Sequence, residues 1–144
     1  MIPLAEITPK MRSLIAGNSF FDGVPVVENL GLSGAQIEKG LTSVGVVVVV
    51  NPILGGTGPT QAGMATSRAK ISVSIRINPS INPTGLQINI YEAITEVCSA
   101  VLAFVPQPGD SKFELDPEDQ FGLEDFNDSL LAYSVSFVKK TQLV

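Results

Sequence analysis

GVVVVVNPIL at residues 45–54 and RAKISVSIRIN at residues 68–78 decide the fold of this chain. The first stretch contains five consecutive valines, which is typical of a strand covered on both faces. The second alternates between apolar residues and small or basic residues from Ile71 to Ile77, so it predicts a strand with one face in the core. We expect the two strands to pair as a β-hairpin, because one segment connects them.

The connecting segment, GGTGPTQAGMATS at residues 55–67, has no charged residue and only one large apolar side chain. It cannot bury a core of its own, and a connection this long inside a compact domain is usually functional or disordered. We therefore predict a long, flexible hairpin arm that contacts other subunits. The candidate interface residues on this arm and on the strand after it are Gly55, Thr57, Thr60, Gln61, Met64, Arg68 and Arg76.

Two amphipathic helices are predicted from apolar residues at helical spacing. Residues 8–16 begin with a threonine N-cap followed by proline in the first turn, where a missing N–H is tolerated. Residues 86–105 carry a wide apolar stripe and stop before two prolines, so they predict the central helix. A short helix is compatible with residues 33–43.

Further strands are predicted at residues 24–28, 111–115 and 129–138. In the last of these, alternate apolar residues from Leu131 to Phe137 face the core. The order of elements predicts an α+β fold in a single domain, residues 1–144. Its sheet is expected to be mostly antiparallel, with the helices packed on one face.

Charged residues make up 16% of the 144-residue chain, and the formal net charge is −5. A low charge fraction favours a surface that is covered by a partner, with a compact, weakly charged monomer as the alternative. Net negative charge argues against a sequence-independent grip on nucleic acid. Arg68, Lys70 and Arg76 share one face of a strand and could meet phosphates, but a solvated or subunit-facing strand explains them more simply.

Eight of the 14 acidic residues lie between Asp110 and Asp128, which predicts an acidic loop at about residues 110–128. A solvated loop is favoured over a calcium or magnesium site, because the spacing does not match an EF-hand loop. The carboxylates that such a metal site would use are Asp116, Glu118, Asp119, Glu124 and Asp125.

The chain contains no histidine, which excludes a Ser-His-Asp triad, a Cys-His dyad and a histidine metal site. The glycines at residues 55–58 lack the Gly-Lys-Ser/Thr ending of a phosphate-binding loop. We therefore expect no catalytic, cofactor-binding or metal-binding residues, and no enzyme activity.

Cys98 is the one cysteine, so no intramolecular disulfide can form. Its place on the apolar stripe favours a small buried residue over a reactive thiol. The N-terminus lacks a signal-peptide pattern, and the longest apolar run is too short to span a bilayer as a helix. We expect a soluble protein made in a reducing cytoplasm.

The order of elements is accompanied by three stretches with a recognisable layout. They are FFDGVPVV at residues 20–27, ISVSIRINPSINPTGLQINIYEAITEVCSAVLAF at residues 71–104 and LLAYSVSFVKKTQLV at residues 130–144. Together they resemble the tail terminator (tail completion) proteins of long-tailed bacteriophages. The likeness covers most of the chain and lies in layout, because the family has no catalytic motif to compare.

The resemblance implies a structural protein of the virion tail or neck, made in the host cytoplasm. It implies a homo-oligomeric ring, a hexamer, that caps the tail tube, stops its polymerisation and meets the head-side connector. The expected partners are other copies of the chain, the tail tube protein and the connector or neck protein, with DNA only passing through the lumen and no membrane. A ring subunit contacts its neighbours through two different surfaces. An arm that orders against a neighbour suits that arrangement.

Three alternatives stay open at the level of sequence. The first is another phage neck or tail subunit, such as a head–tail connector or a tube-related protein. The second is a small enzyme that uses carboxylates and a divalent metal. The third is a monomeric ligand-binding module.

Overall fold

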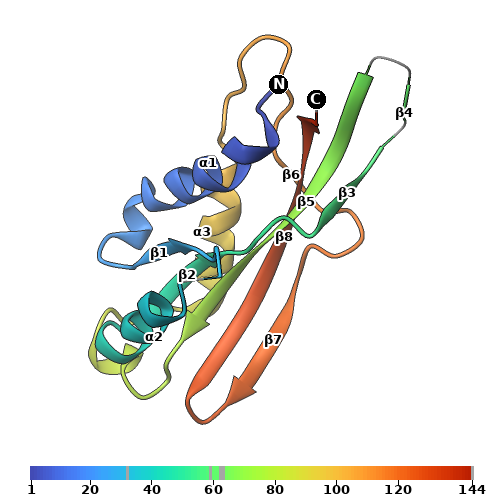
Figure 1. Ribbon diagram of the computed structural model, residues 1–144. Coiled ribbons are helices and arrows are strands. Elements are labelled where there is room, and N and C mark those ends of the chain that lie inside the picture. Colours follow the sequence, from blue (N-terminus) through green and yellow to red (C-terminus); the bar gives the residue numbers. More distant parts are fainter. Residues whose placement is uncertain (32, 59, 62–63, 144) are drawn as a thin grey trace.

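The computed structural model describes residues 1–31, 33–58, 60–61 and 64–143. A mixed sheet runs through it in the order β1-β2-β5-β8-β6, while β3 and β4 pair with β5 and β7 pairs with β8 (Figure 1). The strands are β1 (Val26–Glu28), β2 (Val46–Val50), β3 (Gly55–Thr57), β4 (Thr60–Gln61), β5 (Met64–Ile77), β6 (Glu114–Leu115), β7 (Phe121–Asn127) and β8 (Leu130–Gln142). The helices are α1 (Leu4–Ala16), α2 (Gly34–Ser43) and α3 (Ile90–Leu102), with short 3-10 turns at Ser19–Phe21 and Asn82–Thr84.

β5 and β8 form the long antiparallel ladder of the sheet, which pairs Thr66 with Gln142 at one end and Ile77 with Leu131 at the other. β2 lies antiparallel to β5 on the other side, with Val48 opposite Ile75. This pairing confirms the predicted hairpin between the valine-rich strand and the alternating strand that follows it. β1 runs parallel to β2, so the sheet is mixed but mostly antiparallel, and the α+β class is confirmed.

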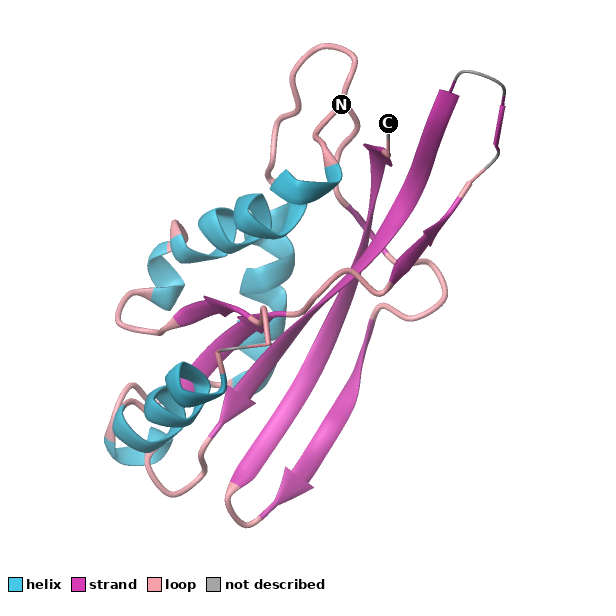
Figure 2. Ribbon diagram, viewed as in Figure 1, coloured by secondary structure: helices cyan, strands magenta, loops and turns pink. Residues whose placement is uncertain are grey.

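The main core lies between one face of the sheet and helices α1 and α3 (Figure 2). Helix α1 contributes Ile7, Met11 and Ile15, which are fully buried at spacings of four residues. The alternate apolar residues of β5 face the same core, as do Val135 and Phe137 of β8. The period of two in these strands therefore separates a core face from a polar face, as predicted.

Helix α2 packs on the opposite face of the sheet, which differs from the prediction that all helices share one face. Its Ile37 contacts Val47 and Val49, which form a second, smaller apolar cluster with it. All five valines of β2 are at most 1% exposed. A strand of consecutive valines needs an apolar cover on both faces, and α2 supplies the second cover.

Both long helices differ from their predicted bounds. Helix α1 begins at Leu4 instead of residue 8 and contains Pro9 in its interior, because the extra turn places Ile7 in the core. Helix α3 begins at Ile90 instead of residue 86. The side chain of Asn82 donates to the carbonyl of Ile88 and accepts from its N–H, which holds the preceding residues in a turn.

The acidic segment is folded as strands over part of its length. The short strand predicted at residues 111–115 is confirmed at β6, whereas the predicted loop is wrong at β7. Both strands are antiparallel to β8. A bulge between Leu123 and Asp125 shifts the register of β7 and hides its alternation in the sequence. The closing strand β8 is also longer than predicted and continues to Gln142.

Candidate functional site

The predicted arm lies against β5 as an extension of the sheet. Gly55 and Thr57 belong to β3 and pair with Lys70 and Arg68, and Gln61 of β4 pairs with Met64. The strand β5 therefore begins at Met64, earlier than the predicted residue 68. Residues 59, 62 and 63 of the predicted arm lie outside the described residues. The flexibility of the arm stays a prediction.

Gly56 shows why the hairpin is glycine-rich at its base. A Cβ at this position would lie 2.9 Å from the carbonyl oxygen of Arg68 and would meet the side chain of Ser67. Because real Cβ atoms do not approach a backbone oxygen so closely, only glycine lets β3 lie this close to β5. The glycine-rich composition from which an arm was predicted is therefore also what allows β3 to pair with β5.

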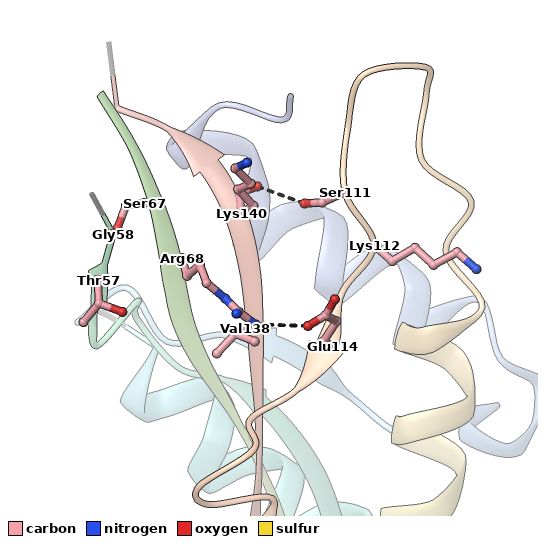
Figure 3. Close-up of a pocket in the computed structure, with 9 residues that line it drawn as sticks. All are labelled: Thr57, Gly58, Ser67, Arg68, Ser111, Lys112, Glu114, Val138 and Lys140. Atoms are coloured by element: carbon pink, nitrogen blue, oxygen red, sulfur yellow. Dashed lines mark hydrogen bonds and ion pairs between the residues drawn. The ribbon is translucent and has the colours of Figure 1, made fainter. Parts of the chain in front are cut away.

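A hollow lies between this hairpin and the segment before β6, on the sheet face opposite α1 and α3 (Figure 3). It is lined by Thr57, Gly58, Ser67, Arg68, Ser111, Lys112, Glu114, Val138 and Lys140, which we call the β5–β8 hollow. Arg68 reaches Glu114 across the end of β8, with 3.0 Å between Nη2 and Oε2. Both side chains are more than half exposed, so this ion pair contributes little to stability. Lys112 and Lys140 are exposed.

A second ion pair stands beside the hollow, between Lys70 of β5 and Asp116. Their Nζ and Oδ2 atoms are 2.8 Å apart, and the Asp116 side chain is 6% exposed. The hydrogen bond from Lys70 and another from the N–H of Glu118 hold the pKa of Asp116 below its usual value. The same hydrogen bond raises the pKa of Lys70. Asp116 is therefore engaged in fixing the loop to the sheet.

A third ion pair is buried at the same end of the molecule. Lys139 Nζ donates to Asp110 Oδ1 over 2.7 Å, and both side chains are at most 3% exposed. Burial raises the pKa of Asp110, but hydrogen bonds from Lys139 and from the N–H of Ser111 outweigh it, so the pKa lies below its usual value. Thr141 adds a bond from Oγ1 to the carbonyl of Ile2. These contacts fix the segment that carries Ser111 against β8.

β7 presents an exposed apolar surface at the opposite end of β8. Phe121, Leu123 and Phe126 are 58%, 57% and 72% exposed. They pair with Val135, Tyr133 and Leu131, which face or adjoin the main core, so the three side chains extend the core face of the sheet beyond its helices. The bulge before Asp125 keeps Phe126 on the same face as Leu123.

Tyr91 of α3 stands beside this surface. It is 62% exposed, and its ring lies edge-on to that of Tyr133, with 5.8 Å between the centroids. We call Tyr91, Phe121, Leu123 and Phe126 the apolar edge patch. Sequence reasoning placed these strand residues in an acidic loop and missed the patch. The three large apolar residues between acidic ones were the available signal.

The structure brings two of the seven predicted interface residues to the β5–β8 hollow and places Arg76 far from them. Thr57 and Arg68 line the β5–β8 hollow together with residues that were not predicted. Arg76 lies eight positions further along β5, which places it about 26 Å away. There its Nε donates to Ser74, so the structure does not bring Arg76 together with the others.

The carboxylates proposed as a metal set do not form a cluster. In the described part of the chain, no group of three or more acidic or sulfur ligands is close enough to share an ion. Cys98 is half-buried, and burial raises the pKa of its thiol. A raised pKa lowers the thiolate fraction on which cysteine reactivity depends.

Comparison with known proteins adds no family to this picture. No protein-family model matches the chain, and no characterised protein matches it in sequence. Within the described residues, the helices are too short or too polar to cross a bilayer.

Proposed function

We propose that this chain is a structural, non-enzymatic subunit that forms a ring and terminates the tail tube of a long-tailed phage. In that role it stops tube growth and joins the tube to the head-side connector. The resemblance of residues 20–27, 71–104 and 130–144 to tail terminator proteins supports the specific role.

The apolar edge patch is the observation that carries the broader role of binding protein subunits. An edge strand with three large apolar side chains, each more than half exposed, is a template for association unless a partner covers it. Charge fraction is low, as in proteins that cover part of their surface. The patch and the β5–β8 hollow differ in chemistry, which suits a ring subunit that also binds other proteins.

The proposal places the chain in the virion tail or neck after synthesis in the host cytoplasm. Its partners are further copies of itself, the tail tube protein and the connector. DNA passes through the lumen without being held, because the net charge of −5 repels phosphate.

The proposed role is tested on the purified chain by native mass spectrometry and by electron microscopy with polymerising tail tubes. Closed rings and tubes capped at one end are the expected result. A chain that stays monomeric at tens of micromolar and never joins a tube would show that the proposed role is wrong.

A further inference from the structure

β7 is an edge strand of the sheet. It pairs with β8 on one side, and in the described part of the chain no strand pairs with its other side (Figure 1). Six of its seven residues are exposed. An edge strand presents N–H and C=O groups to which a further strand can hydrogen-bond. β7 is therefore a place where an extended segment of a partner can join the sheet.

The two faces of β7 differ in chemistry. Phe121, Leu123 and Phe126 lie on the face that continues the main core. Asp125 stands opposite Ala132 across the bulge, so it lies on the other face of the sheet. A segment that pairs with β7 meets apolar side chains on one face and a carboxylate on the other, because successive side chains of a strand alternate between faces.

The charge around β7 is negative. The sequence has no Lys or Arg from residue 113 to residue 138, and helix α3 has none either. Beside the apolar face, Glu92 and Glu96 of α3 line a hollow together with Tyr91. A strand that joins β7 is therefore favoured when it carries positive charge, since opposite charges on neighbouring strands attract.

The carboxylates of β7 itself are available to such a partner. Arg76 lies in the same row of the sheet as Asp125, but it stands two strands away, at about 10 Å. Among the described residues, neither Glu124 nor Asp125 takes part in an ion pair. Full overlap of two antiparallel copies of β7 would place Glu124 opposite Glu124, and like charges in that position are destabilising. The acidic edge therefore disfavours a second β7.

This chain has no basic strand to offer in its place. Apart from Lys112, its basic residues lie in α1 and α2 or in β5 and β8, which are interior strands of the sheet. Lys112 stands between Ser111, which bonds to the backbone of β8, and the buried Phe113. The basic segment that suits β7 therefore has to come from a different protein.

We propose that β7 binds an extended segment of a different protein, in which apolar residues alternate with Lys or Arg. The segment adds to the edge as a further strand. Its apolar side chains cover Leu123 and Phe126, and its basic side chains meet Asp125 on the other face. Backbone hydrogen bonds supply affinity, and the alternation supplies selectivity. The inference rests on the proposed role of this chain as a subunit that binds other proteins, and it specifies the chemistry of one partner.

Three synthetic peptides of the length of β7 test the strand addition. The basic probe alternates Lys with Ile or Val, the acidic probe has Glu at each Lys position, and the grouped probe has the residues of the basic probe with all Lys at one end. In fluorescence anisotropy we expect the basic probe to bind about tenfold more tightly, or better, than the other two. In hydrogen exchange it should protect amides of β7 and leave those of β1, at the other edge, unchanged. Equal binding of the acidic or grouped probe would show that the inference is wrong.

Charge reversal on β7 provides the second test. Glu124→Lys with Asp125→Lys should lose the basic probe and bind the acidic probe instead. The matched control is Glu6→Lys with Glu38→Lys, which changes the net charge equally at exposed positions in α1 and α2. The control should bind the basic probe like the original chain, and circular dichroism should show that all variants are folded.

Ring formation is measured separately, by native mass spectrometry. If the chain forms rings but its reversed variant binds the basic probe as tightly as the original, the inference is wrong while the ring stands. If the basic probe binds as expected but no ring forms, the terminator role is wrong while the inference stands. If no probe binds and Leu123→Ser with Phe126→Ser dissociates oligomers of the chain, a second copy covers the patch and the inference is wrong.

Discussion

β2 and β7 are both rich in large apolar side chains, and they lie in opposite surroundings. The valines of β2 are at most 1% exposed, with the main core on one face and α2 on the other. The apolar residues of β7 are more than half exposed. Apolar residues in the centre of this sheet therefore stabilise the fold, whereas those at its edge are available to hold a partner.

The largest expected effect on stability is at β2, in the centre of the sheet. Val48→Asp places an unpaired charge in a strand covered on both faces, and we expect it to lower the free energy of unfolding by more than about 4 kcal/mol. Circular dichroism and urea titration should show a chain that is unfolded at room temperature. A folded Val48→Asp protein would mean that β2 is less enclosed than its burial indicates.

The buried ion pair comes next. Asp110→Ala leaves the ammonium of Lys139 buried without its carboxylate, so we expect a loss of about 3 kcal/mol in urea titration. Glu114→Ala breaks the exposed pair with Arg68 and serves as the control, with a loss below about 1 kcal/mol. Equal losses of stability in the two variants would show that breaking the buried ion pair costs no more than breaking the exposed one.

Acid should destabilise the fold through the same carboxylates. The pKa values of Asp110 and Asp116 are lowered in the folded state, so their contribution is fully present above the unfolded value of about 3.9. It is lost as the pH falls from there through the lowered pKa values. Thermal unfolding between pH 5 and pH 2 should show a falling midpoint, and Asp116→Asn should flatten that fall. If the midpoint of Asp116→Asn fell with pH as steeply as that of the original chain, Asp116 would not contribute to the loss of stability in acid.

Removing the hairpin tip should affect stability less. The described residues of β3 are all exposed, so deleting residues 56–65 should cost about 1 kcal/mol or less. Assembly should weaken, because Thr57 and its neighbours line the β5–β8 hollow. Circular dichroism checks the fold, and native mass spectrometry checks the assembly. Loss of the folded signal would show that the hairpin belongs to the core.

The smallest effect on stability is expected at the edge. Leu123→Ser with Phe126→Ser removes side chains that are already exposed, so the free energy of unfolding should change by less than about 0.5 kcal/mol per site. Binding of the alternating basic peptide should weaken about tenfold or more, since apolar residues at the centre of a contact dominate its energy. Val105→Ser, at a residue that is 81% exposed outside β7, is the control and should leave that binding unchanged.

Much of the fold could be predicted because local patterns reported directly on burial. The five valines of β2 and the alternation of β5 were assigned to strands, and their pairing followed from adjacency along the chain. Element ends were less accurate. Helix α3 is capped by Asn89, and the residues before the cap are held in a turn by the side chain of Asn82, which bonds to a residue six positions away. Helical periodicity contains no information on that turn.

Composition by itself determined which chemistry is absent, because a chain without histidine cannot build a histidine-dependent site. The order of residues also determined the strands of the central sheet, because the apolar period and the preference of β-branched residues for strands act locally. Only the tertiary structure decided where the candidate surfaces lie. The burial of Lys139 beside Asp110 and the meeting of Arg68 with Glu114 both join residues far apart in the chain. Such contacts depend on how the sheet brings β8 against its neighbours, and no local pattern encodes that.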